Sequence, residues 1–197
     1  MLKKTGWTET LKIEHLWGLV VLTGIFIFMN TQPIRPNDFW FHLAYGRVLV
    51  QSGQMPLLDT FSFSMAGQPY ASIYTYWLAE LFMYAIFEKG GAEWMVLAFS
   101  LLVTAAYGII FITNYSETQN WRAAALGVLF AGALGITNWN VRPQLLAYFY
   151  AALANWAIYQ ARKQPKNWPW GLILVFMMAL WVNSHGTFFI PFALAVF

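Results

Sequence analysis

The chain has 197 residues, of which 59% are hydrophobic and 10% charged, and its net charge is +3. Soluble domains carry about 25% charged residues, so this composition indicates that the lipid bilayer is the main solvent. The absence of cysteine excludes disulfides and thiolate metal sites, and the bases are too scattered to indicate a nucleic-acid partner.

Residues 14–31 form the first predicted membrane span, and Lys3, Lys4 and Lys12 precede it. Because Lys and Arg accumulate on the cytoplasmic side of membrane proteins, the N-terminus is expected in the cytoplasm. No small-residue cleavage site follows the apolar run, so we interpret it as an uncleaved anchor.

The following segment, 32–76, is broken by prolines and glycines and cannot cross lipid, because its backbone polar groups would stay unpaired there. Residues 76–89 are apolar, but as a helix they reach only about 21 Å, against a hydrocarbon layer of about 30 Å. Their polar residues recur at every fourth position, which is typical of a helix lying in the membrane interface. These residues are Tyr76, Glu80, Tyr84 and Glu88. We therefore predict an extracytoplasmic loop, 32–91, with juxtamembrane helices and a turn at Gly90 and Gly91.

Four further spans are predicted at about 94–113, 121–137, 145–159 and 168–182. Another begins near Phe188, but the remaining residues reach only about 15 Å, so we expect a fragment that stops within a span. If the helix 76–89 lies in the membrane interface, the cytoplasmic side carries more bases than the outer side. If this helix spans the membrane, the two sides carry nearly equal numbers of bases, so the positive-inside rule favours the interfacial placement. The predicted cytoplasmic bases are Lys3, Lys4, Lys12, Arg122, Arg162, Lys163 and Lys166. The expected fold is all-α, with one transmembrane helix bundle over residues 1–197.

Polar side chains follow the point where the first span leaves the membrane. A helix is predicted to start after Pro36, and Asp38, His42 and Tyr45 would share one face of it. A carboxylate beside an imidazole can act as a general base or hold a divalent cation near an anionic headgroup. The alternative is that Asp38 only caps the helix and His42 sits at the interface.

Two more polar motifs are expected on the same membrane face. Arg142 and Gln144 open a span, and a guanidinium there is suited to bidentate contact with phosphate, or it is a topological anchor that reaches the headgroups. Asn183 and His185 lie between two apolar spans, where they either bind a ligand or form a polar turn.

We predict that the four residues Asp38, His42, Arg142 and His185 line one outward-facing pocket, flanked by the helix that carries Glu80. This fails if Asp38 lies more than about 15 Å from both Arg142 and His185, well beyond the Debye length. The plainer interpretation of Glu80 is a residue on the water-facing side of the interfacial helix.

Five stretches together resemble a known superfamily. They are residues 38–47 (DFWFHLAYGR), 53–62 (GQMPLLDTFS), 76–80 (YWLAE), 142–144 (RPQ) and 181–186 (WVNSHG). Their order and spacing are similar to the N-terminal half of bacterial membrane proteins related to the GT-C glycosyltransferases, which include protein mannosyltransferases and lipid A aminoarabinose transferase. Two features depart from the pattern, since relatives continue with further spans and often carry a His-Glu or similar polar pair where residues 74–76 stand.

The resemblance implies a location in the bacterial cytoplasmic membrane and transfer of a sugar from an isoprenoid-phosphate donor at the outer face. It implies that Asp38 acts as base or metal-site residue, with His42 assisting. The expected substrate-binding residues are Arg142, Gln144, Asn183, His185 and Glu80. A second hypothesis is a non-catalytic transmembrane subunit that packs against other membrane proteins on a GT-C-like scaffold. A transporter ranks last, because no predicted span carries a mid-membrane acidic residue.

Overall fold

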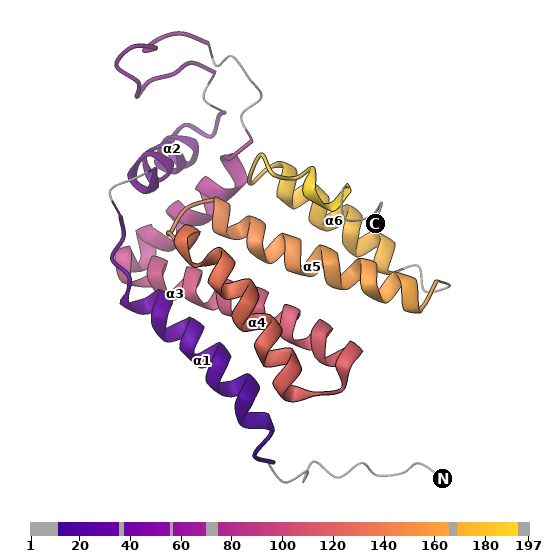
Figure 1. Ribbon diagram of the computed structural model, residues 1–197. Helices are drawn as coiled ribbons and strands as arrows, with labels where there is room; N and C mark the ends of the chain where they lie inside the picture. Colours follow the sequence, from indigo (N-terminus) through magenta and orange to yellow (C-terminus); the bar gives the residue numbers. More distant parts are fainter. Residues whose placement is uncertain (1–11, 36–37, 56, 70–74, 166–168, 193–197) are drawn as a thin grey trace, which may run out of the picture.

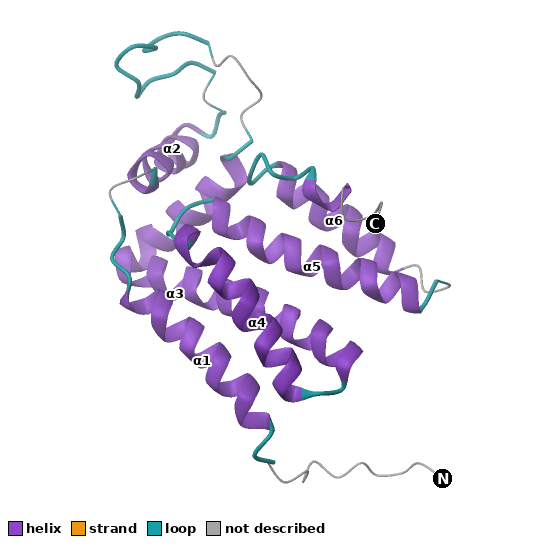
Figure 2. Cartoon of the chain, viewed as in Figure 1, coloured by secondary structure: helices purple, strands orange, loops and turns teal. Residues whose placement is uncertain are grey.

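The computed structural model describes residues 12–35, 38–55, 57–69, 75–165 and 169–192. Within these residues the regular structure is helical, and the helices pack side by side as a bundle (Figure 1, Figure 2). The helices are α1 (His15–Thr31), α2 (Phe39–Ser52), α3 (Trp77–Thr118), α4 (Trp121–Gly135), the 3-10 helix η1 (Ile136–Asn138), α5 (Gln144–Lys163) and α6 (Pro169–Val182). The predicted all-α fold class is confirmed.

The predicted spans coincide with helices, but only some of these helices are long and apolar. Among the described residues, α3 is the one helix that could cross a membrane by both length and composition. The helices α1 and α6 are apolar but have only 17 and 14 residues. The five-span arrangement therefore stays a prediction.

Helix α3 consists of two helical segments joined at a kink. At the kink, Gly91 has φ 65° and ψ −155°, a conformation outside the helical region that glycine adopts readily because it lacks Cβ. The sequence predicts a break at this glycine pair, between the segment 76–89 and the span that follows. The break is confirmed, and it turns the first segment of α3 toward α2.

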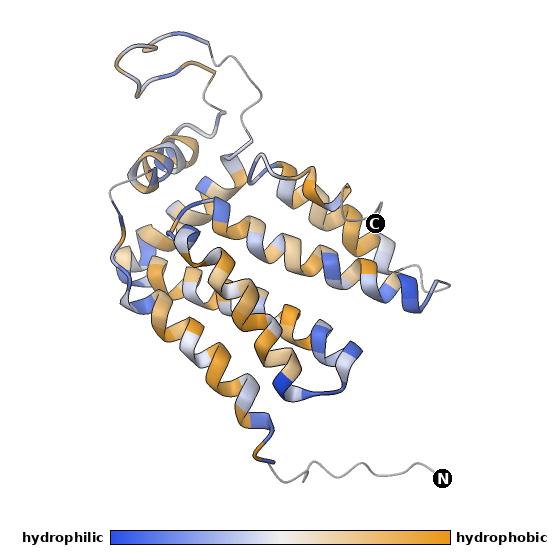
Figure 3. Cartoon of the chain, viewed as in Figure 1, coloured by the Kyte–Doolittle hydropathy of each residue, from blue (hydrophilic) through white to orange (hydrophobic). Residues whose placement is uncertain are grey.

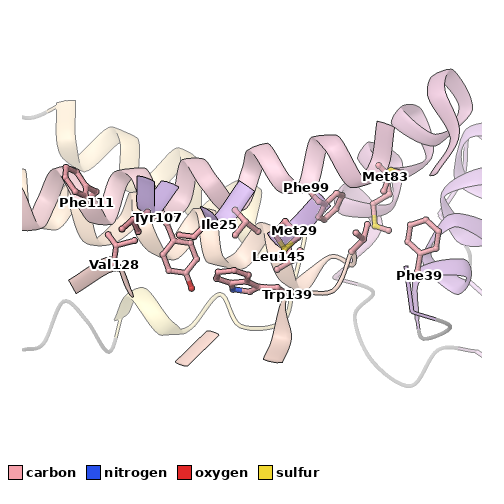
Figure 4. Packing of buried hydrophobic residues seen from close by; sticks show 14 of the residues in the cluster. Ile25, Met29, Phe39, Met83, Phe99, Tyr107, Phe111, Val128, Trp139 and Leu145 are labelled. Carbon is pink, nitrogen blue, oxygen red and sulfur yellow. The ribbon is translucent and has the colours of Figure 1, made fainter. Parts of the chain in front are cut away.

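The core is built around α3, which packs against α1, α2, α4 and α5, while α6 packs against α5. Figure 4 shows how Tyr107 of α3 lies beside Trp139 of the linker after η1, with Ile25 of α1 close by. The rings of Tyr107 and Trp139 meet edge to face at 5.2 Å. The linker that carries Arg142 is therefore anchored in the core.

The two ends of the bundle differ in their polar residues. At one end, Arg122 of α4 lies 5.6 Å from the ring of Trp17 in α1, and Lys163 of α5 pairs with Glu117 of α3 at 3.0 Å. The predicted cytoplasmic bases Lys3, Lys4 and Lys166 lie outside the described residues. The opposite end gathers α2, the first segment of α3, the 139–143 linker and the turn after α6.

The predicted outer loop, 32–91, contains α2 and the first segment of α3. Between them, residues 53–55 and 57–69 extend away from the bundle (Figure 1). The expected further span near Phe188 begins with turns at 186–189 and helical geometry at 190–192, and residues 193–197 lie outside the described part.

Candidate functional site

Three polar segments that are distant in sequence meet at the α2 end of the bundle. Asp38 precedes α2, Arg142 lies in the linker before α5, and His185 follows α6. The Asp38 carboxylate Oδ2 lies 3.6 Å from Arg142 Nη1. Asp38 therefore lies close enough to Arg142 for the two residues to share one site, as the sequence analysis required.

Asp38 stands at the N-cap position of α2, but its side chain makes no capping hydrogen bond. The carboxylate faces Arg142 instead. The Asp38 side chain is 59% exposed and that of Arg142 23%, so the pair lies at the surface of the site. An exposed ion pair contributes about 0–1 kcal/mol to stability, so this one orients the guanidinium more than it stabilises the fold.

His42 and Glu80 form a buried pair between α2 and α3. His42 Nδ1 lies 2.7 Å from Glu80 Oε1, with the side chains 9% and 0% exposed. The expectation that Glu80 faces water is wrong, because α2 covers this side of α3. Gly46 allows the close approach, since a Cβ at this position would lie 2.4 Å from the Glu80 carbonyl oxygen. His42 is likewise buried between helices, so it does not sit at an exposed interface.

Tyr76 links the two histidines of this end. Its ring centroid lies 5.4 Å from that of His42 and 5.6 Å from that of His185. Tyr76 was not among the residues predicted for the site. Its place one turn before Glu80, in the same polar stripe, is the signal that identifies it.

Asn183 ties the end of α6 to the start of α3. Its backbone oxygen accepts a hydrogen bond from Leu78 N at 3.0 Å, and its side-chain Oδ1 accepts one from Trp77 Nε1 at 2.8 Å. The predicted substrate-binding amide therefore has its oxygen engaged within the fold. This contact places the turn that carries His185 beside α3.

His185 is held by its neighbour Thr187 and surrounded by basic groups. His185 Nδ1 lies 2.9 Å from Thr187 Oγ1. Burial lowers the pKa of His185, and the nearby charges of Arg142 and His42 lower it further. The imidazole is therefore biased toward its neutral form.

Gln144, at the first position of α5, lines a cavity of about 440 Å³. Thr187, the partner of His185, lines it as well, so the cavity adjoins the site. The rest of its wall is largely apolar and includes Tyr107, Ala147, Ala151, Trp181 and Ile190. A cavity with a polar end and an apolar body suits a ligand that is itself amphipathic.

One of the two roles considered for Asp38 was to hold a divalent cation, the other being to act as base. Among the residues that the structure describes, no three His, Asp or Glu side chains group in a way that could hold a metal ion. Asp38 has a guanidinium as its neighbour, and a nearby cation disfavours a second one. The divalent cation stays a prediction.

Comparisons with protein-family models, with curated proteins and with solved structures found no match. The likeness to GT-C transferases therefore rests on the five sequence stretches. Four of them, 38–47, 76–80, 142–144 and 181–186, contribute residues to this end of the bundle.

Proposed function

We propose that the chain is a multi-pass protein of the bacterial cytoplasmic membrane, with its N-terminus in the cytoplasm and the Asp38–Arg142 pair at the outer face. Large apolar side chains on the outside of the bundle support this placement, because lipid can cover them. Examples are Leu19 of α1 (62% exposed), Phe130 of α4 (72%) and Val175 of α6 (68%). The hydropathy colouring of Figure 3 shows the most hydrophilic residues mainly near helix ends.

In this setting, the polar end of the bundle is a site for transferring a sugar from an isoprenoid-phosphate donor to an acceptor hydroxyl. The observation that carries the proposal is the meeting of Asp38, His42, Arg142 and His185 from three separate segments. Arg142 and His185 would hold the donor phosphate: the Arg142 guanidinium supplies the positive charge that stabilises a phosphate leaving group in a partly dry site, and the neutral His185 imidazole supplies a hydrogen bond. The base comes from α2, and the adjoining apolar cavity suits the isoprenoid stem.

Binding of farnesyl phosphate and of farnesol to the purified full chain in detergent, measured by calorimetry, tests the proposal. Wild type should prefer the phosphate. Arg142→Gln should weaken farnesyl phosphate binding about 10- to 100-fold, because hydrogen bonds to a charged group contribute roughly 1.5–3 kcal/mol. Arg47→Gln is the control, since Arg47 is an exposed base on α2, the helix that carries His42. Equal affinity of wild type for both compounds would refute the proposal.

A second candidate is a non-catalytic subunit on the same scaffold. Both acidic residues of the site already have basic partners on other elements, Asp38 with Arg142 and Glu80 with His42. Pairs of this kind can serve only to hold helices together. The subunit hypothesis predicts that farnesyl phosphate and farnesol bind alike, so the same calorimetry separates the two candidates.

A further inference from the structure

We infer, on the basis of the proposed transfer, that His42 is the base that takes the acceptor proton and that Glu80 is its positioning residue. Glu80 comes from the first turn of α3 and is fully buried, so it cannot contact solvent. Its carboxylate oxygen lies 2.7 Å from His42 Nδ1. The contact fixes the direction of the imidazole ring, and with the Glu80 carboxylate ionised it places the ring proton on Nδ1.

The hydrogen bond between these atoms uses one proton. With the Glu80 carboxylate ionised, Nδ1 carries this proton and donates it, so a neutral imidazole keeps its lone pair on Nε2. Within the part of the chain that the structure describes, the contact with Glu80 is the one hydrogen bond of the His42 side chain. Nε2 is therefore available to accept a proton.

The His42 ring lies on the side of the site where the phosphate is expected. It packs against Tyr76, which contacts His185 in turn, and the charges of His42 and Arg142 both act on His185. Asp38 is already engaged in an ion pair with the Arg142 guanidinium, 3.6 Å away, so its carboxylate is directed at a residue of the site. Of the two candidates, Asp38 before α2 and His42 within it, His42 is the better placed for proton transfer.

In the transfer step, the acceptor hydroxyl gives its proton to His42 Nε2 while its oxygen forms a bond to the anomeric carbon of the sugar. The bond from that carbon to the donor phosphate oxygen breaks, and its electron pair leaves with the isoprenyl phosphate. Arg142 meets the charge that develops on the phosphate. The imidazolium that results is stabilised by the Glu80 carboxylate and later releases its proton to water.

Nitrogen-15 magnetic resonance of histidine-labelled full chain in detergent tests the tautomer directly, because the protein has only three histidines. Wild-type His42 should show protonated Nδ1, and Glu80→Gln should move it toward the Nε2-protonated form. Transfer of radiolabelled sugar from a farnesyl-phosphate hexose to membrane acceptors should fall about 100-fold or more in this variant. Glu80→Asp keeps the carboxylate and should restore the Nδ1-protonated form and part of the transfer. Glu88→Gln removes an exposed carboxylate from the same stripe and should change neither.

The transfer rate of the wild type should fall at acidic pH, and this acidic limb should cover the pH range in which the nitrogen-15 signal shows His42 taking up a proton. The comparison needs no variant. A limb that follows a different residue overturns the inference, and so does an unchanged tautomer or an unchanged transfer rate in Glu80→Gln. If the wild type still prefers farnesyl phosphate to farnesol, any of these results removes only the role of His42 and Glu80, and the proposed function stands. Equal binding of farnesol and farnesyl phosphate removes the proposed function and this inference together.

Discussion

Gly46→Ala is the substitution that most directly tests the packing of α2 on α3. Gly46 is buried in this contact, and a Cβ there would lie 2.4 Å from the backbone oxygen of Glu80 and 2.8 Å from Tyr84 Cβ. A backbone oxygen within a helix cannot rotate away as the end of a flexible side chain can. The added methyl group must therefore displace α2 as a whole.

The size of the displacement follows from the contact distance. Moving the new Cβ from 2.4 Å to an ordinary van der Waals separation of 3.4 Å requires a shift of about 1 Å. The same shift lengthens the His42–Glu80 contact from 2.7 Å to as much as about 3.7 Å, where the hydrogen bond is lost. Overpacking of this kind costs about 1–3 kcal/mol, which corresponds to a fall in Tm of about 2–12 °C for a chain of this size.

Thermal unfolding in detergent, followed by near-ultraviolet circular dichroism, measures this effect. Gly24→Ala in α1 is the matched control, because a Cβ at Gly24 would meet nothing within 4 Å. The nitrogen-15 signal of His42 should also change in Gly46→Ala and stay constant in Gly24→Ala. If both variants unfold at the same temperature and keep the His42 signal, the close contact between α2 and α3 is wrong.

Three further outcomes are expected. Asn183→Ala removes the hydrogen bond from Trp77 and should lower the free energy of unfolding in denaturant by about 1–3 kcal/mol. The pKa of His185 is lower in the fold than in the unfolded chain, so unfolding takes up protons at acidic pH. The free energy of unfolding should thus be constant above about pH 6.5 and fall as the pH drops below it, and His185→Gln should remove this slope. A membrane-impermeant thiol reagent should label Gln68→Cys on intact cells and Lys163→Cys only after permeabilisation, and labelling of Lys163→Cys from outside would contradict the topology.

The local features of this chain follow from its sequence. Apolar runs predict α1, α4, α5 and α6 to within a few residues, because helix formation depends on neighbours three and four positions apart. The Gly90–Gly91 pair likewise predicts the break in α3, since the ability of glycine to adopt positive φ depends on the residue itself and not on its distant neighbours. Alternating helix directions then bring Asp38 and Arg142 to one end of the bundle, as the sequence indicates.

The partners of the polar side chains depend on contacts between distant segments. A polar stripe shows which face of a helix differs from the rest, but the pattern is the same whether water or another helix covers that face. Glu80 was for this reason expected in water, whereas α2 buries it against His42, 38 residues earlier in the chain. Asp38 similarly had the sequence of a helix cap, and its pairing with Arg142 arises because the linker before α5 is fixed in the core. Burial and ion pairing are set by this packing, which the local pattern of residues does not encode.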